Sequence, residues 1–183
     1  MELVRIFALE PLDGEPAGLY AVRYDGEEED CFNGAFRQLA DAEELTDFLV
    51  NNERDLFTPY FARLGLNGYV EMATHIVDLA SSFKKQIHRF ELRQGHPAPS
   101  LESELFEPLY PHDISGKADY QTSKAKPNRK PDAVIRIYAI RLNRHCYVVT
   151  GHAIKLTKDM NRPHLQAELN KLRLVRNWLH NGD

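Results

Sequence analysis

The stretch VIRIYAIRLNRHCYVVTGHAIKLT, residues 134–157, decides the fold class. Apolar residues alternate with polar or basic ones, and β-branched and aromatic residues are frequent, which is typical of half-buried strands. We expect Asn143 and Arg144 to form a two-residue turn between two antiparallel strands. The pattern therefore predicts a small sheet of two or three short strands that carries an unusual number of basic residues.

The register that follows from this turn divides the side chains between two faces of the hairpin. The face expected to meet the core holds Ile135, Ile137, Ala139, Val148, Ile154 and Leu156. The opposite face is expected to hold Arg136, Tyr138, Tyr147, Val149, Lys155 and Thr157. A longer turn, or a bulge at Gly151, would move one strand by a residue and change this grouping.

The rest of the chain supplies further strands and several helices. Residues 3–9 and 19–24 read as a strand pair, and ELFEPLY, residues 104–110, reads as a short strand or an anchor. Asp41 is a good helix N-cap with Glu44 three residues later, residues 69–92 show helical periodicity, and a last helix begins near Pro163 and ends near His180. We therefore predict an α+β fold, with a small, mostly antiparallel sheet, two or more packed helices and a C-terminal helix.

We interpret residues 1–183 as a single elaborated domain with three parts. Residues 1–110 form an acidic part with the strand pair and helices, and residues 133–183 form a basic sheet with the C-terminal helix. Residues 111–132 have little to bury and are expected to be a basic flexible loop.

The charge of the chain is divided unevenly along its length. The net charge is −4, but residues 1–116 hold 9 Lys and Arg against 22 Asp and Glu, whereas residues 117–183 hold 14 against 5. A basic part of this kind indicates an anionic partner, although the acidic part could also simply neutralise it within the fold.

The composition also indicates what the protein lacks. No apolar run approaches the ~20 residues of a membrane-spanning helix, and the first residues lack the pattern of a secretory signal, so we expect a cytoplasmic protein without a membrane partner. Cys31 and Cys146 lie far apart and fit no metal-ligand spacing. The basic part has few carboxylates, which disfavours a two-metal nuclease. We therefore expect neither a metal nor another cofactor.

The basic face predicts a phosphodiester site. Arg136 and Lys155 are candidates to stabilise phosphate charge, with Tyr138 placed to stack on a base or handle a proton. His152, one strand step away, is a candidate acid or base near neutral pH. Further basic residues are expected to contact RNA: Lys124, Lys126, Arg129, Lys130, Arg141, Arg144 and Lys158. Ordinary solvated cations on a sheet face remain the alternative for each residue taken alone.

Residues 104–179 resemble the closing segment of the RelE/HigB/ParE toxin superfamily. The likeness lies in the order of elements: a strand with Arg136, a hairpin, the step Lys155-Leu156-Thr157, and a helix that opens with Arg162-Pro163. For RNA-cutting members, the resemblance implies metal-independent cleavage of mRNA, free or on the ribosome, and an antitoxin protein as partner. It implies Arg136 and Lys155 as phosphate stabilisers, His152 as base or acid, and Tyr138 as a positioning residue.

Two alternatives stay open beside the toxin reading. Many RNA-cutting members carry a Tyr or His in a tail after the last helix, whereas this chain has only His180 there, which favours a module that binds nucleic acid without cleaving it. ParE-like members act on a topoisomerase instead of RNA. The acidic part could equally belong to a partner-binding regulatory protein of a bacterial mobile element, so the sequence leaves open whether the protein is an enzyme.

Overall fold

A computed structural model describes residues 1–10, 14–56, 59–93, 100–110 and 120–182 of the chain. Its centre is a six-stranded sheet in the order β1-β2-β6-β5-β4-β3. The strands are β1 (Glu2–Ala8), β2 (Gly18–Arg23), β3 (Phe106–Pro108), β4 (Gln121–Ala125), β5 (Ile135–Asn143) and β6 (Cys146–Ile154). Every neighbouring pair is antiparallel except β2 and β6, which are parallel. The sheet thus joins strands from the acidic and the basic parts of the chain.

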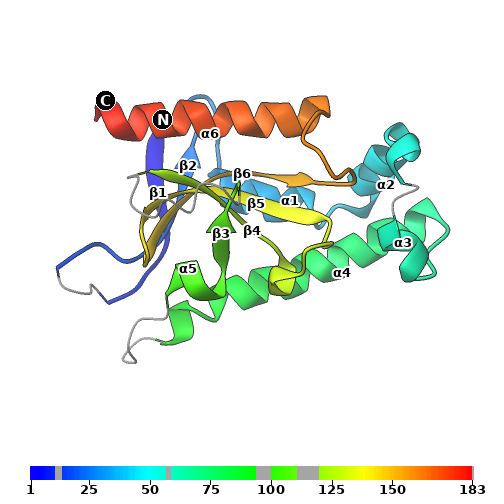
Figure 1. The fold of residues 1–183 in the computed structure, drawn as a ribbon, viewed down its shortest axis with the longest axis horizontal. Coiled ribbons are helices and arrows are strands. Elements are labelled where there is room, and N and C mark those ends of the chain that lie inside the picture. The colour runs from blue at the N-terminus through cyan, green and yellow to red at the C-terminus, as the bar shows by residue number, and fades with distance from the viewer. Residues whose placement is uncertain (11–13, 57–58, 94–99, 111–119, 183) are drawn as a thin grey trace.

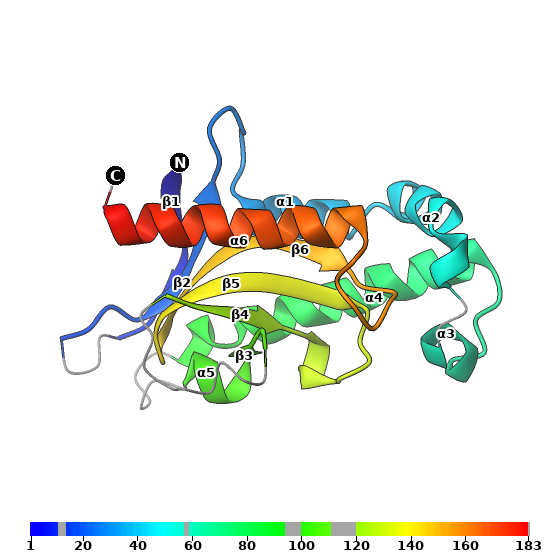
Figure 2. The same ribbon diagram turned by 45° about the horizontal axis from the view of Figure 1, so that its top comes forward.

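Helices cover both faces of this sheet, which gives three layers (Figures 1 and 2). The C-terminal helix α6 (Pro163–Asn181) lies on one face, and α1 (Cys31–Gln38) and the long helix α4 (Tyr69–His88) lie on the other. Helices α2 (Ala42–Asn51) and α3 (Pro59–Arg63) lie beyond one end of the strands, and α5 (Leu101–Glu104) precedes β3. The predicted α+β class, the mostly antiparallel sheet and the C-terminal helix are confirmed.

Local sequence signals explain the helix boundaries. The side chain of Asp41 accepts hydrogen bonds from the backbone N–H groups of Glu43 and Glu44 and begins α2, as the sequence predicted. Pro163 occupies the first turn of α6, and Gly182 closes that helix in the left-handed conformation at φ 69°. Short 3₁₀ turns lie at Glu53–Asp55, Glu91–Arg93 and Pro127–Arg129.

The hairpin of β5 and β6 has a different register from the predicted one. Asn143 pairs with Cys146, so the turn consists of Arg144 and His145 and lies one residue later than expected. Moving the turn by one residue leaves both faces as predicted, but Leu142 is also unpaired, because Arg141 already pairs with Tyr147. A bulge at Thr150, between the pairs Ala139–Val149 and Tyr138–Gly151, shifts the pairing back. The predicted faces are therefore wrong between the turn and the bulge, where Tyr147 and Val149 face α1 and α4 and Val148 faces α6. Beyond the bulge, Ile154 and Leu156 lie on the face predicted for them.

Both faces of this hairpin are buried, which the sequence did not indicate. Tyr138 and Ile140 pack under Leu165, Leu169 and Leu172 of α6. The face predicted to be open is therefore open only near its Arg136 end. In the predicted loop at 111–132, residues 121–125 instead form β4, which pairs with β5; residues 111–119 of that prediction lie outside the described residues.

No helix in the described ranges combines the length and apolar character needed to cross a lipid bilayer.

Candidate nucleic-acid site

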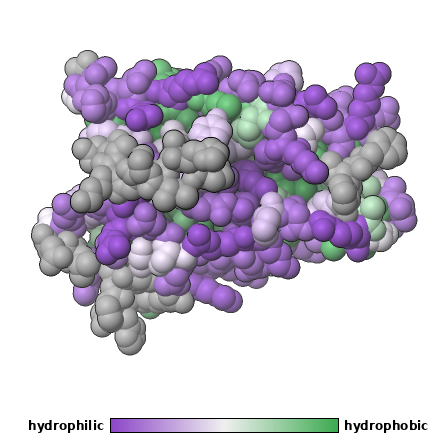
Figure 3. Space-filling model, viewed as in Figure 1, coloured by the Kyte–Doolittle hydropathy of each residue, from purple (hydrophilic) through white to green (hydrophobic). Residues whose placement is uncertain are grey.

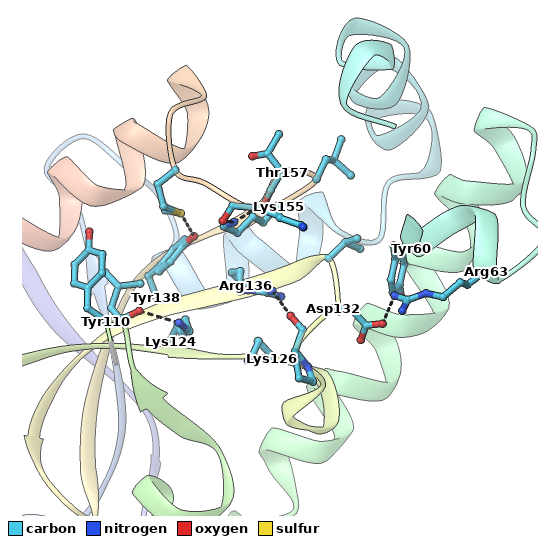
Figure 4. Close-up of a pocket in the computed structure, with 16 residues that line it drawn as sticks. Tyr60, Arg63, Tyr110, Lys124, Lys126, Asp132, Arg136, Tyr138, Lys155 and Thr157 are labelled. Carbon is cyan, nitrogen blue, oxygen red and sulfur yellow. Dashed lines mark hydrogen bonds and ion pairs between the residues drawn. The ribbon is translucent and has the colours of Figure 1, made fainter. Parts of the chain in front are cut away.

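A pocket of about 610 Å³ opens at the end of the sheet nearest α3 (Figure 4). We call it the cationic pocket, and it is lined by Tyr60, Arg63, Leu109, Tyr110, Lys124, Lys126, Pro131, Asp132, Val134, Arg136, Tyr138, Lys155, Leu156, Thr157, Lys158 and Met160. Six of these residues are basic and one is acidic. Figure 3, in the same view as Figure 1, shows hydrophilic side chains around a hollow between the layers of α6 and α4. The volume is in the range of sites that hold nucleotide-sized ligands, roughly 300–1,000 Å³.

Strand β5 supplies a buried charge to the pocket. Arg136 is only 8% exposed, and its guanidinium donates hydrogen bonds to the backbone carbonyls of Ala133, Ile135 (2.9 Å) and Pro131 (3.1 Å). No described carboxylate forms an ion pair with Arg136. Burial lowers the pKa of the guanidinium, which nonetheless stays charged near neutral pH. Its position is therefore fixed by the backbone, while its charge has no ion-pair partner in the part of the chain that the structure describes.

The segment after β6 supplies Lys155 and Lys158. The backbone N–H of Lys155 donates to the Val134 carbonyl at 2.7 Å, which extends the pairing of β5 and β6 to the pocket wall. The Lys155 ammonium donates to the carbonyls of Thr157 and Lys158, and Lys158 itself is exposed. The end of this segment is tied to the turn after α2, because both Asp55 carboxylate oxygens accept hydrogen bonds from Arg162.

Strand β4 supplies Lys124 and Lys126. The Lys124 ammonium donates to the Leu109 carbonyl at 2.8 Å. Glu107 of β3 lies 2.5 Å from the Lys126 nitrogen and 3.7 Å from that of Lys124, so it neutralises mainly Lys126. Both lysines lie in the segment predicted as a flexible loop, and pairing of β4 with β5 is what brings them beside Arg136.

Aromatic side chains stand at both ends of the pocket in Figure 4. Tyr138 is 1% exposed, and its hydroxyl lies 3.7 Å from the sulfur of Met160. Tyr110 is 47% exposed and also lines the pocket. Tyr60 stands opposite, with its hydroxyl 3.0 Å from Nε2 of His75. Exposed tyrosines beside cations are suited to stacking on unpaired bases.

Helix α3 also contributes to the pocket, and none of its residues was predicted for the site. Tyr60 and Arg63 belong to the acidic part of the chain, and Arg63 forms an ion pair with Asp132, which follows β4. No local motif marks these residues. Tyr110 closes the stretch ELFEPLY, which the sequence identified only as a strand or an anchor.

The electrostatics of the pocket favour an anion. Burial lowers the pKa of Lys124 and of Lys155, and the neighbouring Arg136 charge lowers both further. The remaining effects on Lys124 include Glu107, which opposes the shift. Cations that are partly desolvated and repel one another gain free energy when a phosphate enters between them. The pocket can therefore bind a phosphodiester and stabilise negative charge that develops on it.

Six of the predicted site residues come together in the cationic pocket: Arg136, Tyr138, Lys155, Lys124, Lys126 and Lys158. Four others do not line it. Arg129 donates to backbone carbonyls of α5, Arg141 pairs with Glu102 at 3.3 Å, and the Arg144 carbonyl accepts from the N–H of Glu102. Lys130 is exposed near the pocket without lining it. These four are placed around α5 and the 127–132 turn.

His152 is also absent from the cationic pocket. It lies in a separate crevice of about 160 Å³ between α2, β6 and α6, with His164 and Glu168. Burial lowers the pKa of His152 to about 4, with a smaller effect of the Lys171 charge. The ring is therefore neutral at pH 7, and the structure does not group it with Arg136 and Lys155.

Comparisons of the chain with protein-family models, with curated proteins and with solved structures find no match. The functional interpretation therefore rests on the residues and their geometry.

Proposed function

We propose that the protein is a RelE/HigB-like toxin or a derivative of one, a metal-independent endoribonuclease that acts on mRNA in the cationic pocket. The observation that carries the proposal is the charge of that pocket. Six basic side chains line it with a single carboxylate, and Arg136 and Lys155 have no ion-pair partner among the described residues.

The proposed reaction uses the substrate's own nucleophile. The ribose 2′-hydroxyl loses its proton to solvent water as its oxygen attacks the adjacent phosphorus, and the bond from phosphorus to the 5′-oxygen breaks. The 5′-oxygen takes up a proton as it leaves, and the products are a 2′,3′-cyclic phosphate and a 5′-hydroxyl. Arg136 and Lys155 stabilise the charge that grows on the phosphoryl oxygens. Because burial and the neighbouring cations lower the pKa of Lys155 and Lys124, either ammonium is better suited than an ordinary lysine to give a proton to the leaving oxygen.

A second candidate function is RNA binding without cleavage. The specific observation in its favour is that most donors of the two proposed stabilisers are already used: Arg136 gives three of its five N–H groups to carbonyls and Lys155 gives two of its three. His152, the side chain with the most suitable ordinary pKa, lies in the other crevice. A pocket of this kind would hold a phosphate by charge alone.

Induced expression in a bacterial host tests the proposal. The wild-type chain is expected to arrest growth and to create new mRNA 5′ ends, and Arg136→Ala/Lys155→Ala is expected to abolish both. The matched control is Lys130→Ala/Arg144→Ala, which removes the same charge from exposed residues that do not line the pocket and is expected to behave as wild type. New ends that persist in the pocket variant would refute this site, and arrest without new ends would favour binding without cleavage.

A further inference from the structure

The crevice that contains His152 has no role in the proposed RNA chemistry. It is bounded by α2, the end of β6 and the first half of α6, and its volume is about 160 Å³. This is below the range of roughly 300–1,000 Å³ in which small-molecule sites fall. A single long side chain is the ligand that fits such a space.

Glu168 contributes a buried carboxylate to the crevice. It is only 7% exposed, and the Lys171 ammonium binds its Oε1 at 2.8 Å. Its Oε2 is buried and has no partner with hydrogen-bond geometry among the described residues, although the nearby His152 backbone lowers the pKa of the carboxyl. Lys171 is not among the residues that line the crevice, whereas Glu168 is. A buried carboxylate oxygen without a partner is unfavourable, so a donor that entered the crevice would stabilise it.

The other polar groups of the crevice also suit a ligand that donates hydrogen bonds. His152 is neutral at pH 7, because burial lowers its pKa to about 4. Nε2 of His164 donates to the Ile154 carbonyl at 3.0 Å, since a carbonyl only accepts, and the ring meets Phe48 edge-on at 5.2 Å. Glu44, from the first turn of α2, adds a second carboxylate. Two carboxylates and aromatic faces around a narrow space match a guanidinium, which carries five N–H donors on a flat group.

The segment of the chain that contains α1 and α2, which contribute lining residues to the crevice, is acidic. Residues 27–50 include eight Asp and Glu and a single basic residue, Arg37. Arg37 is already paired with Glu29 at 2.6 Å. A surface with this charge repels RNA and attracts a cationic chain, so it cannot be an extension of the cationic pocket.

We propose that the crevice and the acidic surface of α2 form a docking site for a basic segment of a protein partner, with one arginine side chain of that segment inserted beside Glu168 and Glu44. The site is independent of the proposed RNA function, because none of its residues lines the cationic pocket.

The site is tested by titrating the full chain with an acetylated hexa-arginine peptide at about 0.15 M salt and measuring the binding by calorimetry. Glu44→Gln and Glu168→Gln are each expected to weaken binding by about tenfold, since each removes a charge-assisted hydrogen bond to the guanidinium. The matched control is Glu43→Gln, which removes the same charge from the neighbouring exposed position outside the crevice. It is expected to lower the affinity for the peptide by less than about threefold.

Hexa-lysine is expected to bind more weakly than hexa-arginine, because an ammonium does not present the flat array of donors. Equal losses in Glu43→Gln and Glu44→Gln, or equal affinities for the two peptides, would overturn the proposal and reduce the site to a general acidic surface. Glu44 is exposed at the start of α2, so Glu44→Gln is expected to fold. The affinity of Glu44→Gln therefore still tests the site if Glu168→Gln alters the fold.

Discussion

Lys155 and Arg136 line the same pocket, where burial of the Lys155 ammonium and the charge of the Arg136 guanidinium both lower the pKa of Lys155. The two side chains come from β5 and from the segment after β6, and backbone carbonyls fix both. Two cations held together, with no ion pair to a described carboxylate, destabilise the empty pocket slightly and make it selective for anions. This relationship is the physical basis of the predictions on RNA.

Lysines inside and outside the pocket are expected to differ in their effect on RNA binding. Lys158→Ala should weaken binding of single-stranded RNA several-fold and should reduce the slope of log K against log salt by about 0.7, because one phosphate contact is lost. Lys130→Ala, the control, removes an equally exposed charge that does not line the pocket. Filter-binding titrations at several salt concentrations check this; equal effects of the two variants would contradict the pocket as the RNA site.

RNA affinity is expected to fall as the pH is raised from 7 toward the ordinary lysine pKa of 10.5. Lys124 and Lys155 have lowered pKa values, so they lose their charge earlier than exposed lysines do. A bound phosphate favours the charged forms, and binding at alkaline pH should therefore take up protons. Calorimetry in two buffers with different ionisation enthalpies measures this uptake. Its absence at pH 9 would show that neither lysine contacts the RNA.

The neutral His152 predicts a loss of stability in acid. Its folded pKa of about 4 lies below the ordinary value of 6.5, so the unfolded chain binds the proton more tightly. The free energy of unfolding contributed by this group is fully present above pH 6.5 and decreases as the pH falls, by about 3 kcal/mol at pH 4. Glu168, whose pKa burial raises, acts in the opposite direction.

The contribution of His152 is therefore measured as the difference in free energy of unfolding between wild type and His152→Gln. In urea titrations between pH 4 and 7, the free energy of unfolding should decrease less toward low pH in His152→Gln than in wild type. Parallel curves of the free energy of unfolding against pH for the two proteins would contradict the burial of a neutral ring.

Gly151 and Glu168 are expected to be energetically coupled. A Cβ added at residue 151 would lie 1.9 Å from Oε2 of Glu168, so Gly151→Ala should lower the free energy of unfolding by about 1–3 kcal/mol through overpacking. In the background of Glu168→Ala, the same change should cost much less. A double-mutant cycle by urea denaturation measures the coupling. Equal costs in both backgrounds would show that another contact excludes the side chain.

Much of the fold could be predicted from the sequence, because periodicity and capping are local signals. The strand pair of β1 and β2, the cap at Asp41, the length of α4 and the start of α6 at Pro163 all follow from residues close in the chain. The hairpin register was wrong, because Asn143-Arg144 and Arg144-His145 are both plausible turns, and because the irregularity at Leu142 and the bulge at Thr150 each shift the pairing by one residue. Strand β4 was missed, because its lysines read as loop residues until a neighbouring strand pairs with them.

The candidate site could be predicted only in part for the same reason. Arg136, Tyr138 and Lys155 were grouped from strand alternation, which holds for β5 and for the residues beyond the bulge. Tyr60 and Arg63 could not be found, since only the packing of α3 beyond the end of the sheet brings them to the pocket. His152 pairs with Ile137 and Arg136 pairs with Ala153, so strand alternation places His152 and Arg136 on opposite faces of the hairpin. Residues of α2 and α6 then enclose His152 in the other crevice.

Cleavage of a 5′-labelled single-stranded RNA by the purified full chain, in buffer with EDTA, tests the central claim most directly. Wild type is predicted to give fragments that end in 2′,3′-cyclic phosphate. Lys155→Met is predicted to reduce the rate by at least about a hundredfold, the usual contribution of one charge stabiliser or general acid, while Lys130→Ala cleaves as wild type does. Intact RNA that is bound by wild type and released by Lys155→Met would contradict cleavage and leave a binding pocket. Cleavage that Lys155→Met does not slow would contradict the site itself.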